Sequence, residues 1–181
     1  FSARGHYTEK DSPDATDFLG QLSRDWESAA VEAETAGIRT LIFRLALVLG
    51  HDGGLIKQLL LPFRLGLGGP IGDGSQHFSW IHIDDLVNAY LLAIDSPFMQ
   101  GIYHLSAPNP VSNREFARTL AAVLHRPALF PVPGALLRLA YGEAAEVMTS
   151  GQWVTSERLP VSGFNFLYPG LNQALRAIVD K

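Results

Sequence analysis

The sequence contains no cysteine. This absence excludes disulfide bonds, a thiolate nucleophile and zinc sites built on cysteine. An excess of basic residues is also missing, because 14 lysines and arginines face 18 acidic residues, for a formal net charge of −4. Nothing in this balance favours binding to nucleic acid or to an anionic membrane surface. We therefore predict no nucleic-acid partner and no membrane partner.

Long apolar runs are missing as well. No stretch approaches the roughly 18 apolar residues that a membrane-spanning helix needs. The first residues lack the basic-then-apolar layout of a signal peptide, so we predict a cytoplasmic protein. The six histidines are scattered and none forms an H-x-x-x-H pair. His82-Ile83-Asp84-Asp85 could be taken for a metal site, but the aspartates fit helix capping better, so we predict no metal.

What is present is a chain of 181 residues, 47% of them hydrophobic, which is enough for one sizeable core. Apolar residues at helical spacing predict a first helix that Asp17 caps and Gly37 ends. Residues 38–49 are almost continuously apolar, which is typical of a parallel strand buried on both faces. A second helix is predicted over residues 55–65.

A glycine-rich loop over residues 66–80 separates this helix from a predicted strand at 78–83. Asp84 and Asp85 are expected to cap a helix that runs to residue 95, and a strand follows at 101–105. The S-x-x-E pattern at Ser112 and Glu115 predicts a capping box that opens a further helix. Residues 126–133 should be extended, with helices at 134–141, 143–148 and 171–179. This alternation predicts an α/β fold.

The run Gly72-Asp73-Gly74-Ser75-Gln76, followed by Trp80-Ile81-His82-Ile83-Asp84-Asp85-Leu86, resembles the extended short-chain dehydrogenase/reductase superfamily. Residues 61–72, L-P-F-R-L-G-L-G-G-P-I-G, are more similar still to its atypical branch, the NAD-dependent epimerase/dehydratase-like epimerase family proteins. The resemblance extends over essentially the whole chain. It implies the C-terminal part of a Rossmann-type, doubly wound parallel sheet plus a small, mostly helical substrate-side domain.

On this resemblance, residues 1–125 hold the remaining Rossmann-type elements with the inserted loop 66–80, and residues 126–181 form the small domain. The nucleotide-binding half that precedes these elements in the family is expected to be absent from this chain. Its glycine-rich turn between a strand and a helix is not found here. The glycines of residues 66–72 follow a helix and precede a strand, so we interpret them as a substrate-side loop. The intact protein should bind NAD(P), with NADP favoured, and this chain alone should bind none.

Reductases of the superfamily use a Tyr-x-x-x-Lys pair for proton transfer. No tyrosine here is followed four residues later by lysine, and Leu19 and Ser23 stand where the pair should be. Two hypotheses follow. The first is an NAD(P)-dependent epimerase/dehydratase-like oxidoreductase of unknown substrate that lacks the usual pair. The second is a non-catalytic sensor or scaffold that binds a dinucleotide or a partner.

Individual site residues are implied by the same resemblance. Ser2 matches the serine that polarises the substrate carbonyl, although a strand-end serine bonded to backbone is the alternative. Arg44, Ala46 and Leu47 match a strand end that passes close to the nicotinamide. A charge in a buried strand is costly unless it is paired, so Arg44 is more simply explained by a structural carboxylate.

A substrate pocket is expected between loop 66–80 and the C-terminal helices, at the carboxyl ends of the strands. Epimerases of nucleotide sugars carry an arginine where this chain has Phe78, which argues against a sugar diphosphate. Core packing is the simpler role for Trp80 and His82, and a helix-end surface position for Arg64. A small-molecule substrate is predicted, together with a homo-oligomer or a companion N-terminal fragment that covers the apolar strand. The candidate lining comprises Phe63, Arg64, Gln76, Phe78, Trp80, His82, Leu137 and Met148.

Overall fold

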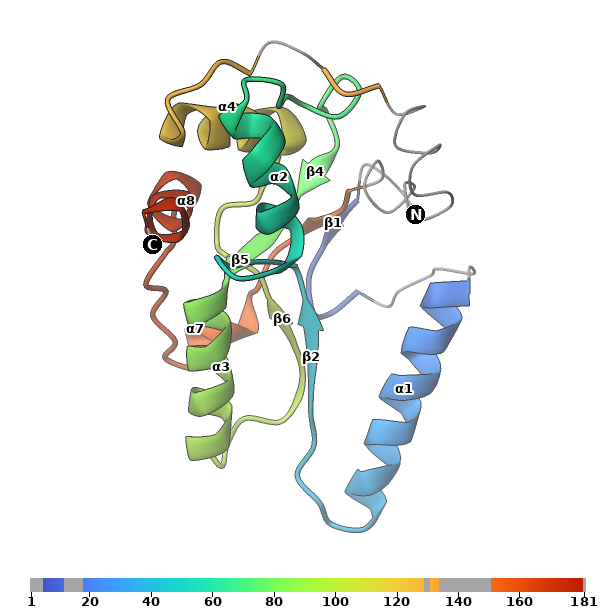
Figure 1. Cartoon of the computed structure of the whole chain (residues 1–181). Helices are drawn as coiled ribbons and strands as arrows, with labels where there is room; N and C mark the ends of the chain where they lie inside the picture. Colours follow the sequence, from blue (N-terminus) through green and yellow to red (C-terminus); the bar gives the residue numbers. More distant parts are fainter. Residues whose placement is uncertain (1–4, 12–17, 129–130, 134–150, 181) are drawn as a thin grey trace.

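A computed structural model of the chain describes residues 5–11, 18–128, 131–133 and 151–180 (Figure 1). Short strands alternate with helices, and they gather into a body from which the first helix stands apart. The helices are α1 (Phe18–Thr35), α2 (Gly54–Arg64), α3 (Ile83–Asp95), α4 (Asn113–Val123), α7 (Arg158–Val161) and α8 (Leu171–Val179). The strands are β1 (His6–Tyr7), β2 (Leu41–Leu45), β3 (Leu47–Leu49), β4 (His77–Phe78), β5 (Trp80–His82), β6 (Gly101–Leu105), β7 (Val111–Ser112) and β8 (Trp153–Val154).

Parallel pairing dominates the strands, as the sequence predicts. β2 pairs with β6, β3 with β5 and β1 with β8, all in parallel, while β4 and β7 are antiparallel. Parallel neighbours need a crossover connection, and α2 lies in the one that joins β3 to β5. The predicted α/β class is confirmed for the described residues.

The prediction of one continuous strand over residues 38–49 is wrong. The chain forms β2 and β3, which are separated by Ala46, because it changes its neighbour there. The backbone N–H of Ala46 donates to the carbonyl of Leu105, at the end of β6. The next residue, Leu47, donates instead to the carbonyl of Ser79, at the start of β5.

The expectation that this segment is buried on both faces is wrong as well. Leu45 is 50% exposed, Leu47 44% and Ile38 59%. In the described part of the chain β2 has one strand neighbour, β6, so no strand covers its second edge there. An apolar run alone therefore does not predict how many strands and helices pack against the segment.

Side chains cap the starts of α4 and α3, whereas α2, α7 and α8 begin without a side-chain cap. The Ser112 hydroxyl accepts a hydrogen bond from the Glu115 N–H at 3.1 Å, which confirms the predicted cap of α4. At α3 the prediction that Asp84 and Asp85 cap the helix is wrong, although both acids lie in its first turn, where they suit its positive end. The cap is His82, whose Nδ1 accepts from the N–H of Asp84 at 3.1 Å.

The core consists of two clusters of buried side chains. The larger one joins α2, α4 and α8 around Trp80, Phe116 and Leu120. The smaller one lies between α3, β6 and α7 around Ile81, Leu105 and Leu159. Since α8 packs against α4 in the larger cluster, the helix assigned to a separate domain shares its core with the elements before residue 125. The division into two domains at residues 125–126 stays a prediction.

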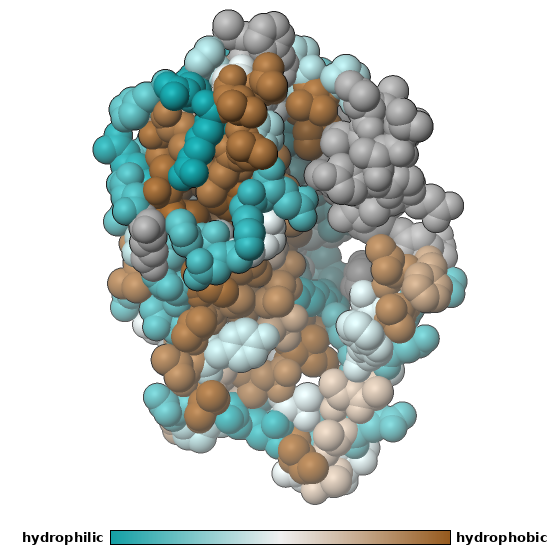
Figure 2. Space-filling view, viewed as in Figure 1, coloured by the Kyte–Doolittle hydropathy of each residue, from teal (hydrophilic) through white to brown (hydrophobic). Residues whose placement is uncertain are grey.

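Helix α1 shares little in this core, since Gly20 is its one buried residue. Its side chains Phe18 and Trp26 are 76% and 69% exposed. Apolar residues continue across the middle of the face in Figure 2 and onto α3, where Leu91 and Ile94 are 52% and 70% exposed. In the part of the chain that the structure describes, no helix is long and apolar enough to cross a membrane.

Candidate functional site

Arg44 holds α1 against the sheet. Its Nε and Nη2 donate to the two carboxylate oxygens of Glu27, each at 2.7 Å, and Nη1 donates to the carbonyl of Asp11 at 3.3 Å. Each of the two paired side chains is about one-fifth exposed, at 22% and 21%. The prediction that a structural carboxylate pairs with Arg44 is therefore confirmed. Whether Arg44 also serves a cofactor stays a prediction.

Ala46 and Leu47 lie at the break between β2 and β3, which is the carboxyl end of β2. Their backbone N–H groups are used by the two neighbouring strands, and the side chain of Leu47 is 44% exposed. Open α/β sheets bind ligands at the carboxyl ends of their strands. This position therefore presents an apolar side chain where a planar ring could lie against it.

Leu19 and Ser23, the two residues that the resemblance matches to the tyrosine and lysine of reductases, lie on α1. Leu19 is 53% exposed, and the hydroxyl of Ser23 donates to the carbonyl of Leu19 at 2.8 Å. A serine hydroxyl bonded to its own helix is not oriented toward a reacting group. That Leu19 and Ser23 replace the proton-transfer pair stays a prediction.

A polar cluster that the sequence did not reveal joins the N-terminal segment to β6 and α7. Glu9 accepts backbone N–H bonds from His104 at 3.2 Å, Glu157 at 3.1 Å and Arg158 at 3.3 Å. Burial raises the pKa of Glu9, but these backbone hydrogen bonds outweigh it and hold the pKa below its ordinary value. Glu9 therefore acts as an ionised clamp between segments that are far apart in the sequence.

His104 lies beside this clamp and is only 4% exposed. Burial lowers its pKa, which favours the neutral ring. Nδ1 lies 3.2 Å from the carbonyl of Thr155, and a carbonyl can only accept, so Nδ1 carries the hydrogen. In the neutral ring Nε2 is then the basic nitrogen. No spacing in the sequence indicated this pair, because 95 residues separate Glu9 and His104.

Loop 66–80 is fixed to the start of α4. The side chain of Asn113 accepts from the N–H of Ile71 at 2.7 Å, and the backbone N–H of Asn113 donates to the backbone carbonyl of Gln76. Gly74 has a φ of +70°, and an added Cβ would lie 2.8 Å from the Cβ of Arg114. Gly74 therefore allows both the turn and the close approach to α4. The side chain of Gln76 donates to the carbonyl of Ile71 at 3.2 Å, so it helps to close its own loop.

Three of the aromatic residues expected in a substrate pocket belong to the larger core cluster. Phe63, Phe78 and Trp80 are 3%, 7% and 0% exposed. The ring of Phe78 stacks on Phe116 with 4.1 Å between centroids, and the indole N–H of Trp80 donates to the carbonyl of Asn109 at 3.3 Å. Arg64, in contrast, lies at the exposed end of α2, and its carbonyl accepts from Arg126. Arg64 is thus exposed, whereas these three aromatic side chains are buried in the core.

His82 and Asp85 connect α3 to the segment before α8. The His82 ring is 1% exposed and lies against Tyr168, with 3.9 Å between ring centroids. The carboxylate of Asp85 is fully buried and accepts from the N–H groups of Leu167 at 2.7 Å and Tyr168 at 3.1 Å. Both residues therefore stabilise the fold, and Asp85 anchors a distant segment where the sequence predicted a helix cap.

Ser79 is a second residue that sequence reasoning missed. Its buried hydroxyl donates to the carbonyl of Gln152 and accepts from the N–H of Val154, both at 2.8 Å. A lone serine between two aromatic residues carries no sequence signal for such a role. Ser2, Leu137 and Met148 lie outside the described residues. Among the described residues, no three histidine or acidic side chains group together as a metal site requires.

Comparison with known proteins gives this fold a family. Residues 20–105 match the NAD dependent epimerase/dehydratase family, and residues 132–178 match a domain of unknown function, DUF1731. The chain is 42% identical over 173 residues to the mouse epimerase family protein SDR39U1, of which it covers 59%. It is 40% identical over 172 residues to a chloroplastic SDR39U1 homolog from Arabidopsis thaliana, of which it covers 49%.

A solved structure agrees with these relatives. The human epimerase family protein SDR39U1, crystallised with NADPH, superposes with a TM-score of 0.92 at 36% identity. The match covers 99% of this chain and 61% of the human chain. The chain thus spans about half to three-fifths of the length of the relatives it matches. Residues 20–105 thus belong to the NAD dependent epimerase/dehydratase family, and the similarity of the chain to the SDR39U1 epimerase family proteins supports the atypical short-chain dehydrogenase/reductase branch.

Proposed function

We propose that the protein to which these residues belong is an NAD(P)-dependent oxidoreductase of the epimerase/dehydratase type, with NADP as the favoured cofactor. The observation that carries this proposal is the match to the human relative crystallised with NADPH, which extends over 99% of this chain. When bound, the cofactor supplies hydride transfer.

The described residues fit the apolar end of such a cofactor. Ala46 and Leu47 end β2 at the side of the sheet where ligands of open α/β folds bind, and Leu47 is 44% exposed. They do not fit its pyrophosphate. Arg44, the charged residue nearest to them in sequence, already forms a bidentate ion pair with Glu27. The glycines of loop 66–80 precede β4 rather than a helix.

We therefore propose that the pyrophosphate is bound outside these 181 residues, and that the chain alone binds no NADPH. Calorimetric titration of the chain with NADPH should show no saturable heat, and low-micromolar binding would contradict this. In a family protein that also carries the glycine-rich turn, Leu47→Asp should weaken NADPH binding about tenfold. The control is Leu61→Asp on α2, which is 67% exposed and should leave the affinity unchanged.

The substrate we propose is small and weakly polar rather than a sugar diphosphate. A diphosphate in a pocket needs cationic partners. The position where nucleotide-sugar epimerases carry an arginine is Phe78 here, and its ring is buried against Phe116. Arg64 is the exposed cation nearest to this loop in sequence. Cyclic or aromatic carbonyl compounds should protect the intact protein against heat more than a UDP-sugar does, and the reverse order would point to Arg64.

A second function is favoured by one observation. Leu19 and Ser23 stand at the positions expected for the tyrosine and the lysine, and the Ser23 hydroxyl donates to the backbone carbonyl of Leu19 on α1. A protein without this pair could bind the dinucleotide as a sensor or scaffold and transfer no hydride. The two functions are distinguished by incubating the intact protein with NADPH and carbonyl compounds. Loss of NADPH absorbance supports the oxidoreductase, whereas tight binding without turnover supports the sensor.

Two further proposals concern the partner that covers the exposed apolar residues and the compartment of the protein. The exposed apolar residues of α1, β2 and α3 would be covered by a companion N-terminal segment or by a second copy of the chain. We retain the cytoplasm as the proposed compartment, although the Arabidopsis relative is chloroplastic by name. Fractionation of cells that express the native gene tests the compartment directly.

A further inference from the structure

A hollow of about 630 Å³ lies at the edge of the sheet where β2 and β6 begin. Thr40 precedes β2, Gly101 opens β6, and both line it together with Arg39 and Arg158. Its volume is within the usual range of small-molecule sites. Since it faces the amino ends of the strands, it is on the opposite edge from the proposed cofactor position at Ala46 and Leu47. A role for it must therefore be independent of the dinucleotide.

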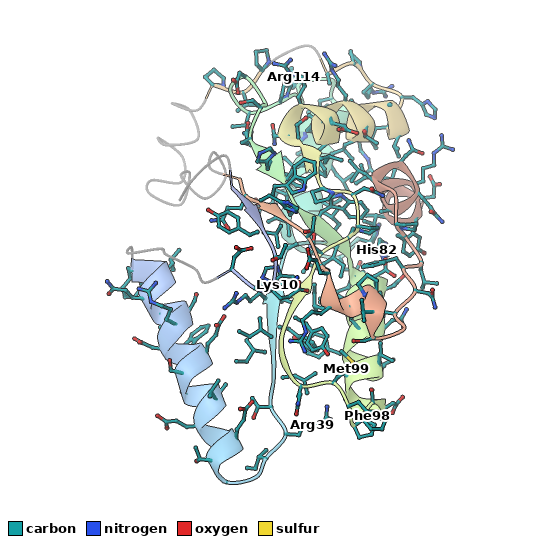
Figure 3. The ribbon with its side chains drawn as sticks, turned by 180° about the vertical axis from the view of Figure 1, so that it is seen from behind. Lys10, Arg39, His82, Phe98, Met99 and Arg114 are labelled. Atoms are coloured by element: carbon teal, nitrogen blue, oxygen red, sulfur yellow. The ribbon has the colours of Figure 1, made fainter. Side chains whose placement is uncertain are left out.

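Arg39 is held firmly at this hollow by one of its terminal nitrogens. Nη1 donates to the carbonyls of Ala93 at 3.0 Å, Ser96 at 3.3 Å and Met99 at 3.0 Å, at the end of α3 and just beyond it. Figure 3 shows Arg39 beside Met99 at the lower end of the molecule. The guanidinium is thus oriented before any ligand arrives, which reduces the entropy lost on binding.

The other edge of the Arg39 guanidinium is unused. Within the described ranges, neither Nε nor Nη2 donates a hydrogen bond, and no carboxylate lies within the 4.0 Å of an ion pair. The Nε–Nη2 edge is one of the faces with which arginine binds two oxygens of a carboxylate or phosphate at once. A fixed guanidinium with this edge free is suited to an oxyanion.

Arg158 adds a second positive charge that is also held in place. Its Nη1 donates to the carbonyl of Ile102 at 2.6 Å, and Nη2 donates to that of Gln100 at 2.9 Å. Its guanidinium carbon lies 4.2 Å from the centre of the Tyr103 ring. Carbonyls and an aromatic face orient the charge without neutralising it, because none of them is anionic. In the described residues Arg158 has no ion-pair partner, so neither cation of the hollow forms an ion pair.

From this arrangement we propose that the hollow binds a small ligand bearing an oxyanion, a phosphate or a carboxylate group. The Nε–Nη2 edge of Arg39 would hold two of its oxygens, and Arg158 would supply the second charge. Glu34, at the end of α1, also lines the hollow and is exposed. Its carboxylate repels an anion, so Glu34 should limit the affinity of the hollow for the ligand and select against highly charged ligands.

The test is calorimetric titration of the chain at low ionic strength with inorganic phosphate and, in a separate arm, with malonate. Saturable binding of either probe is expected, and the tighter one identifies the group. Arg39→Lys should weaken binding about tenfold, since an ammonium cannot form the bidentate contact. Arg158→Met should weaken it severalfold. Glu34→Gln should strengthen it about twofold to threefold.

The control is Arg118→Met, which removes an exposed arginine from α4 and should leave the affinity unchanged. Equal losses in Arg118→Met and Arg39→Lys, or no saturable binding of either probe, would overturn the proposal. Amide NMR locates the site even if a variant folds poorly. The unsubstituted chain should show shifts at Thr40 and Gly101, and shifts confined to other elements would contradict it.

Discussion

Arg44 of β2 and Glu27 of α1 form a bidentate ion pair, with both N–O distances at 2.7 Å. The pair links α1 to the sheet, and Gly20 is the one residue that α1 buries. A helix with so little buried surface depends on such a contact for its position. The pair therefore decides how α1 lies against the sheet.

Breaking this pair should loosen α1. Glu27→Gln leaves the largely buried guanidinium of Arg44 without its carboxylate, so we expect the free energy of unfolding to fall by about 1–3 kcal/mol. Urea denaturation measures this loss, and hydrogen exchange should show faster exchange in α1. Lys10→Met is the matched control, because Lys10 pairs with Glu157 at 2.9 Å but is 84% exposed. Equal losses in the two variants would contradict a structural role for Arg44.

Asp85→Asn tests the buried anchor. The carboxylate accepts from two N–H groups with two oxygens, whereas the amide offers one oxygen and turns a donor toward the second N–H. We expect a loss of about 2 kcal/mol and faster exchange of the Leu167 and Tyr168 amides. Asp84→Asn, one residue earlier and 42% exposed, should change neither quantity. Unchanged exchange in Asp85→Asn would show that other contacts hold this segment.

Acid should destabilise the fold in two steps. Burial lowers the pKa of His104 below its ordinary 6.5. Below pH 6.5, His104 therefore binds a proton more readily in the unfolded chain than in the folded chain, which favours unfolding. The pKa of Glu9 is also lowered from 4.5, so a second loss begins below pH 4.5. Both effects reduce the free energy of unfolding as the pH falls. Urea midpoints measured between pH 8 and pH 4 should decline, with the first decline starting near pH 6.5.

His104→Gln should remove the loss of stability that begins near pH 6.5 and leave the loss below pH 4.5, which belongs to Glu9. His125→Asn is the control, since His125 is exposed and has a φ of +54°, which asparagine tolerates. A pH profile that His125→Asn alters and His104→Gln does not would contradict the assignment.

The exposed apolar face predicts association. Trp26 and Ile94 are 69% and 70% exposed, on helices that flank β2. Light scattering should therefore show oligomers of the 181-residue chain, or a companion fragment that remains bound. Ile94→Lys should reduce association, whereas Leu61→Lys, at a 67% exposed position on α2, should not. A stable monomer of the unsubstituted chain, with no bound fragment, would contradict this prediction.

Local features of this fold could be predicted from the sequence because they depend on neighbours along the chain. The cap at Ser112 and the strand at residues 101–105 agree with the structure for this reason. The break at Ala46, the anchor at Asp85 and the clamp at Glu9 depend on partners tens of residues away. An apolar run shows that a segment prefers burial, but it does not show which neighbour supplies it. The pairing of Arg44 was foreseeable because a charge in an apolar strand needs a partner.

The pairing of β1 with β8 has a consequence for how the chain reaches this structure. His6 lies opposite Trp153, and the Thr155 N–H donates to the carbonyl of Tyr7, so a loop of nearly the whole chain must close before these bonds form. Closing so long a loop costs entropy that few hydrogen bonds repay, and contacts of this sequence separation slow folding. β1 and β8 should therefore be the last strands to pair during folding and the first to separate during unfolding.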